Sequence, residues 1–98
     1  MIEVTALDHI VLRTANVERL VAFYTQVLGC VVERTSAPEF GLTQLRAGSS
    51  LIDIVAVHSI LGRQGGSEPT KQNNNLDHLC LRIKPQSEQA IKRHLSQH

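Results

Sequence analysis

The chain has 98 residues, of which 42% are hydrophobic and 19% charged, and its formal net charge is +1. These values are ordinary for one small globular domain. The ten basic and nine acidic residues are interspersed, so no charged run favours nucleic acid or an anionic membrane as a partner. No apolar run has the length of a membrane span and no basic leader follows Met1, so we expect a cytoplasmic protein.

The first predicted element is a strand over residues 7–13, with the sequence Leu-Asp-His-Ile-Val-Leu-Arg. Its alternation places His9, Val11 and Arg13 on one face. The segment recurs 69 residues later as Leu-Asp-His-Leu-Cys-Leu-Arg at residues 76–82, with five of seven positions identical. This repeat predicts two copies of one module, each with one inward-facing histidine, His9 or His78.

A helix is predicted next, because an apolar stripe at helical spacing runs from a capping Asn16 to a terminating Gly29. Three segments that favour strands follow, at residues 30–35, 42–47 and 51–57, with turn-forming residues between them. The first module is therefore predicted as βαβββ over residues 1–57.

Residues 58–75 have no apolar periodicity and are rich in glycine and asparagine, which predicts a mobile polar linker. The second copy then begins at residue 76 with its strand and continues into a helix over residues 87–97. The repeat offset pairs His98 with Gly29, so three strands of the second module are expected to be missing from residues 76–98. The expectation is one α+β domain of paired βαβββ modules over residues 1–98, the second module being incomplete, whether by nature or because the chain is a fragment.

Three features together resemble the vicinal oxygen chelate superfamily, which includes glyoxalase I, bleomycin resistance proteins and extradiol dioxygenases. They are the two Leu-Asp-His strands, the helix end with Phe-Tyr before Val-Leu-Gly at residues 23–29, and the Leu-Ile-Asp-Ile-Val strand at residues 51–55. The resemblance covers essentially the whole chain. It implies that each module forms half of a cup, with the histidines of both first strands directed at a divalent metal ion.

The resemblance to glyoxalase I also implies a ligand set. His9 and His78 match its two first-strand ligands, and Asp53 matches a carboxylate ligand in the last strand of the first module. Asp53 replaces the usual glutamate and reaches about 1.5 Å less far, one carbon–carbon bond, so without a shift of the strand or the metal we expect it to bind through water or not at all. The remaining ligand, a glutamate, belongs to a strand beyond His98. The metal is left open among Zn, Ni, Fe and Mn.

Arg13 and Arg82 lie on the same strand faces as the histidines. They are candidates for binding an anionic substrate, although exposure at the strand ends explains them equally well. Asp8 and Asp77 precede the histidines and should point the opposite way, so we expect structural roles for them. No residue is assigned to acid or base catalysis.

Three functions fit these residues. The first is a glyoxalase I-like lyase or isomerase, of the lactoylglutathione lyase type, in which the ion acts as a Lewis acid on a small oxygen-chelating substrate. The second is a metal-dependent transferase or dioxygenase of the same superfamily. The third is a metal-free drug-binding protein, for which the three aromatic residues offer little stacking surface. A homodimer with modules paired between chains is expected, because an incomplete module cannot cover its own apolar face.

Overall fold

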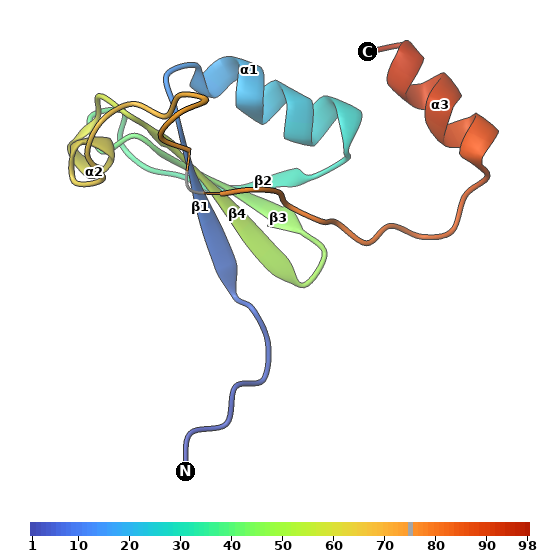
Figure 1. Ribbon diagram of the computed structural model, residues 1–98, viewed down its shortest axis with the longest axis horizontal. Helices are drawn as coiled ribbons and strands as arrows, with labels where there is room; N and C mark the ends of the chain where they lie inside the picture. Colours follow the sequence, from blue (N-terminus) through green and yellow to red (C-terminus); the bar gives the residue numbers. More distant parts are fainter. Residues whose placement is uncertain (75) are drawn as a thin grey trace. The chain divides into compact units, whose positions relative to one another are not determined.

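The computed structural model describes residues 1–74 and 76–98 and divides the chain into two compact units, Met1–Glu68 and Pro69–His98. The first unit holds a four-stranded sheet in the order β1-β4-β3-β2 (Figure 1). Strand β1 (His9–Thr14) is parallel to β4 (Ser50–Ala56). The pairs of β4 with β3 (Leu42–Ala47) and of β3 with β2 (Val31–Thr35) are antiparallel. This α+β arrangement is the predicted βαβββ module.

The helix between β1 and β2 begins where the sequence predicts. The Oδ1 atom of Asn16 accepts a hydrogen bond of 3.1 Å from the backbone N–H of Arg19, which caps α1 (Val17–Ala22). The helix continues as a π-helical segment, η1 (Phe23–Val27), and ends before Gly29, whose φ of 74° favours glycine. Figure 1 shows α1 lying along one face of the sheet.

The core lies between this helix and the central strands. Leu45 and Ile52 are paired neighbours on β3 and β4, and Ile54 follows two residues later on the same face. Leu45 and Ile54 are fully buried, and Tyr24 of η1 is also buried. The opposite face of the sheet therefore carries the side chains of His9 and Asp53.

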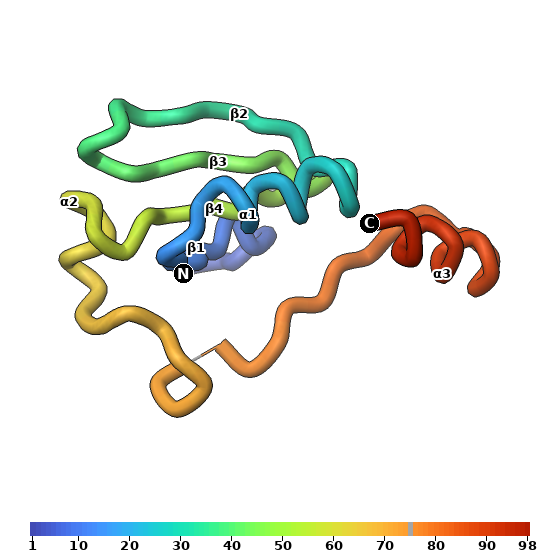
Figure 2. Tube along the Cα trace, turned by 90° about the horizontal axis from the view of Figure 1, so that it is seen from above, coloured from blue at the N-terminus to red at the C-terminus, as the bar shows by residue number. Residues whose placement is uncertain are grey.

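The first half of the predicted linker is folded in this structure. Residues 58–68 belong to the first unit, and a short helix, α2 (Ile60–Arg63), follows β4 (Figure 2). The hydroxyl of Ser59 caps this helix by accepting from Gly62 N–H at 3.1 Å. Gly62 is buried, and a Cβ atom there would collide with the carbonyl oxygen of Ala56. Close packing of α2 on the end of β4 is thus possible only without a side chain at Gly62.

The second unit contains the predicted helix as α3 (Glu88–Ser96), capped by the Ser87 hydroxyl, which accepts from Ala90 N–H at 3.1 Å. The predicted strand over residues 76–82 is wrong for this structure: within the described part of the second unit no strand forms. A strand needs a neighbour that satisfies its backbone groups. The alternating pattern shows that residues 76–82 are able to form a strand, but the described part of this unit contains no partner strand for them.

Candidate metal centre

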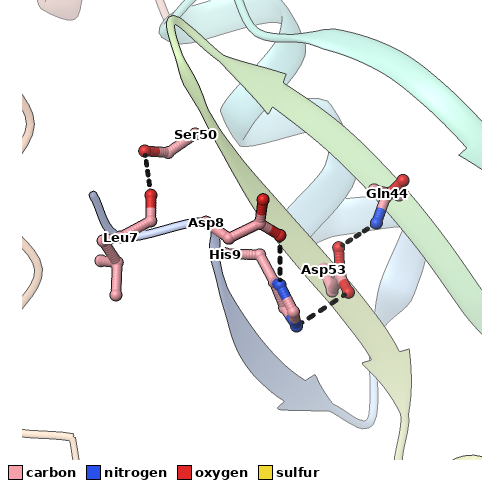
Figure 3. A network of polar contacts seen from close by, with 6 residues as sticks. All are labelled: Leu7, Asp8, His9, Gln44, Ser50 and Asp53. Atoms are coloured by element: carbon pink, nitrogen blue, oxygen red, sulfur yellow. Dashed lines mark hydrogen bonds and ion pairs between the residues drawn. The ribbon is translucent and has the colours of Figure 1, made fainter. Parts of the chain in front are cut away.

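His9 is the first residue of β1, and its ring lies at an exposed end of the sheet face opposite α1. The ring atom Nδ1 is 2.8 Å from Oδ2 of Asp8, and 45% of the His9 side chain is exposed. Figure 3 shows the imidazole held on one side by Asp8 and directed on the other side toward β4. The free ring nitrogen, Nε2, is therefore the atom that faces the neighbouring strand.

Asp53 stands in the middle of β4, where strand pairing fixes its position on both sides. Its partner on β1 is Val11 and its partner on β3 is Gln44, so its carboxylate shares the face of His9. The side chain is 11% exposed. Gln44 Nε2 donates a hydrogen bond of 2.9 Å to Asp53 Oδ1, which provides the partner that a nearly buried carboxylate requires.

The two side chains approach each other across β1 and β4. His9 Nε2 lies 4.0 Å from Asp53 Oδ2 (Figure 3). The hydrogen bond to Asp8 and the negative charge of Asp53 raise the pKa of His9 above its ordinary value. The two predicted ligands of the first module thus lie beside each other, in surroundings whose negative charge favours a cation.

The pair fits a divalent ion. Two ligand atoms on one ion, each about 2.0–2.2 Å from it, are about 2.8–3.6 Å apart at tetrahedral or octahedral angles. The observed 4.0 Å exceeds this range, so binding of one ion by both atoms needs a small movement of the two side chains. The register of β1 and β4 places Asp53 on the same sheet face as His9.

His78, the third predicted ligand, lies in the second unit, and 80% of its side chain is exposed. Its Nδ1 atom is 2.7 Å from Oδ2 of Asp77, the same contact that His9 makes with Asp8. Within residues 1–74 and 76–98, no three histidine, cysteine, aspartate or glutamate side chains come together as one metal site. The structure therefore brings together two of the three predicted ligands, His9 and Asp53.

The guanidinium of Arg13, a candidate substrate ligand, contacts the backbone of its own unit. Its guanidinium donates four hydrogen bonds to backbone carbonyls that follow β4, those of Gly62, Gly65, Gly66 and Ser67, at 2.7 to 3.1 Å. These contacts favour a structural role in which Arg13 holds the segment after α2. Arg82 is exposed in the second unit, and its role as a substrate ligand stays a prediction.

Three side chains at these sites were missed or misplaced by sequence reasoning. Asp8 and Asp77 were expected to point away from the histidines, but each contacts the histidine that follows it. Asp8 lies just before β1 begins, so strand alternation does not fix its direction. The recurrence of Asp-His in both copies was the available signal. Gln44 gave no signal, because its role depends on the pairing of β3 with β4.

The comparisons with known proteins concern the family and the fold of the chain. Residues 6–95 match the sequence profile of the Glyoxalase/Bleomycin resistance protein/Dioxygenase superfamily. The chain belongs to this superfamily. A solved structure of an integron cassette protein from the mobile metagenome of V. cholerae is similar, with 19% sequence identity and a TM-score of 0.61. The similarity covers 99% of this chain and 70% of the cassette protein.

Membership of the Glyoxalase/Bleomycin resistance protein/Dioxygenase superfamily confirms the family resemblance and the α+β fold class. At 19% identity the cassette protein supports the fold alone. No curated protein matches the chain. A bilayer-spanning helix is not found among the described residues, where no helix is both long and apolar enough.

Proposed function

We propose that the chain is a metal-dependent lyase or isomerase of the glyoxalase I kind, acting on a small substrate that presents two adjacent oxygen atoms. The observation that carries this proposal is the approach of His9 Nε2 to Asp53 Oδ2 at 4.0 Å on one face of the sheet. A nitrogen and a carboxylate oxygen suit Zn²⁺, Ni²⁺, Fe²⁺ and Mn²⁺ alike. We leave the choice among these four to the metal analysis below.

In this proposal His9 and Asp53 bind the ion directly, and His78 supplies a third ligand. When bound, the ion provides a Lewis acid for the oxygens of the substrate. Asp53 is negatively charged and nearly buried, so it offsets part of the charge of the ion inside the site. The His9 side chain is 45% exposed, so substrate and solvent can reach an ion bound to it.

We also propose that the protein is a homodimer in which each site combines the first module of one chain with the second module of the other. Strand β1 is an edge strand of the sheet, so its unpaired edge can accept another strand. Residues 76–82 have the alternating pattern of such a strand and no strand partner in the described part of their own unit. Pairing of these two edges between chains would bring a second histidine to His9 and Asp53.

Metal analysis of the purified protein, followed by an assay with a thiohemiacetal substrate, tests this function. We expect about one divalent ion per chain and turnover that disappears in His9→Ala. The matched control is His58→Ala, which removes an exposed imidazole of the same unit and should retain both. Metal without thiohemiacetal turnover would favour a transferase or dioxygenase. A protein without metal after reconstitution would refute the proposal and favour a metal-free binding protein.

A further inference from the structure

His9 and Asp53 each make a hydrogen bond through the polar atom that points away from the other side chain. Asp8 occupies Nδ1 of His9, and Gln44 occupies Oδ1 of Asp53. This leaves Nε2 and Oδ2 as the two atoms that approach each other. We propose that Asp8 and Gln44 are positioning residues, which together select Nε2 and Oδ2 as the metal-binding atoms; the inference rests on the proposed metal site.

The Asp8 contact selects one tautomer of His9. An ionised carboxylate can only accept hydrogen bonds, so the proton between Oδ2 of Asp8 and Nδ1 of His9 must be carried by the ring. In the neutral imidazole the other nitrogen, Nε2, then has a free lone pair. Metal-binding histidines commonly donate their second ring N–H to a carboxylate in this way, which orients the ring and increases its basicity.

The backbone of Asp8 is itself fixed to β4. Leu51 N–H donates to the carbonyl of Asp8 at 2.9 Å, and the Ser50 hydroxyl donates to the carbonyl of Leu7 at 3.0 Å. Figure 3 shows Leu7, Asp8 and Ser50 beside the start of β1. These backbone contacts fix the position of Asp8, although its side chain is 86% exposed. The Asp8 carboxylate is therefore held close to the His9 ring.

Gln44 acts on Asp53 in the corresponding manner. Its amide N–H₂ donates to Oδ1 at 2.9 Å from the directly opposite position on β3. The carboxylate is thereby turned so that Oδ2 faces His9. With Oδ1 engaged by Gln44, Asp53 is arranged to bind an ion through Oδ2 alone.

In the second unit His78 makes the same contact with the aspartate that precedes it. Asp77 Oδ2 lies 2.7 Å from His78 Nδ1, so Nε2 is again the free nitrogen. The chain contains three aspartates, Asp8, Asp53 and Asp77. All three contact a candidate ligand or serve as one, which supports a shared role in the site rather than a general contribution to surface charge.

The Asp8 contact is tested without metal, by ¹⁵N NMR of the histidine rings in EDTA at a pH where His9 is neutral. We expect the Nδ1–H tautomer of His9 in the native protein and a shift toward Nε2–H in Asp8→Ala. Asp8→Asn retains an acceptor oxygen and should restore much of the Nδ1–H form. Glu39→Ala, which removes an exposed carboxylate of the same unit, should leave the tautomer unchanged.

The Gln44 contact is tested with Gln44→Met, which has a similar length and no donor. We expect its Co²⁺ and Ni²⁺ affinity to fall about 10- to 100-fold, as for other residues that orient metal ligands, and its Co²⁺ absorption bands to change. Gln26→Met is the matched control, because Gln26 is exposed on η1, and should bind Co²⁺ like the native protein. Thermal unfolding, recorded in parallel, separates a loss of fold from a loss of ligand orientation.

The outcomes separate this inference from the proposed function. If the native protein binds neither ion but His9 is Nδ1–H in the native form and not in Asp8→Ala, the proposed function and the metal-positioning role both fail, and only the selection of the His9 tautomer by Asp8 stands. Nε2–H in the native protein would overturn the Asp8 role even if metal binds. Unchanged Co²⁺ bands and an affinity within about twofold in Gln44→Met would overturn the role of Gln44.

Discussion

Arg13 Nη2 donates a hydrogen bond of 2.7 Å to the carbonyl oxygen of Gly66, 53 residues further along the chain. The same guanidinium binds the carbonyls of Gly62, Gly65 and Ser67. One side chain on β1 thereby holds the whole segment that follows α2. This segment was expected to be part of a mobile linker, and Arg13 was a candidate for substrate binding with exposure at the strand end as the alternative.

Limited proteolysis tests this role of Arg13. In the native protein we expect the first tryptic cut at Lys71 and slow cleavage at Arg63, because α2 and its hydrogen bonds must open before a protease can bind there. Arg13→Ala should accelerate cleavage at Arg63 severalfold. Arg34→Ala, which removes an exposed arginine of the same unit, should not. Equal cleavage rates at Arg63 in the native and Arg13→Ala proteins would show that the hydrogen bonds of Arg13 do not hold this segment.

The pH dependence of metal binding follows from the environment of His9. Its pKa is raised by the hydrogen bond to Asp8 and the charge of Asp53, and a metal ion binds only the neutral imidazole. The His9⁺ interactions stabilise the metal-free fold at low pH, and this contribution is lost as pH rises through the raised pKa. Metal affinity should change in the opposite sense and weaken as pH falls through that value.

Asp8→Asn should lower the pKa of His9 and extend metal binding to lower pH, although the affinity at high pH decreases. NMR titration of the metal-free protein measures the first effect, and calorimetry at several pH values measures the second. Glu39→Gln, which removes the same charge at an exposed position, serves as the control. A His9 pKa that does not change in Asp8→Asn would show that Asp8 is not its partner in solution.

Sites that combine two chains make a distinctive prediction for mixed mutants. His9→Ala and His78→Ala should each weaken metal binding severely when purified alone, because each removes a ligand from every site. Co-refolding the two should partly restore binding, because one site of a mixed dimer then keeps both histidines. If each chain built its own site, every site in the mixture would lack one histidine, and no recovery would be observed.

Some elements and contacts of this structure can be predicted from the sequence, and others cannot. Alternation alone places His9 on one strand face, and helical spacing between Asn16 and Gly29 predicts the helical segment that α1 and η1 form together, because these patterns are local. The contact between Gln44 and Asp53 depends on the register of two strands, which no local pattern records. The ordering of residues 62–67 rests on backbone carbonyls that bind Arg13 and therefore leaves no trace in their side-chain composition.

The segment at residues 76–82 shows the reverse case. Its pattern is that of β1 with five of seven positions identical, yet it forms no strand within its described unit. A strand is a property of a pair of segments, whereas helix α3 satisfies its own backbone groups and was predicted correctly from residues 87–97.

The central claim is that His9 and Asp53 bind one metal ion, and calorimetric titration of Ni²⁺ into metal-free protein tests it most directly. The variants are His9→Ala and Asp53→Asn, with His58→Ala as the matched control and circular dichroism to verify folding. We predict that each ligand variant loses more than about a hundredfold in affinity, whereas His58→Ala binds like the native protein. Native-like Ni²⁺ binding by folded His9→Ala and Asp53→Asn proteins would contradict the assignment.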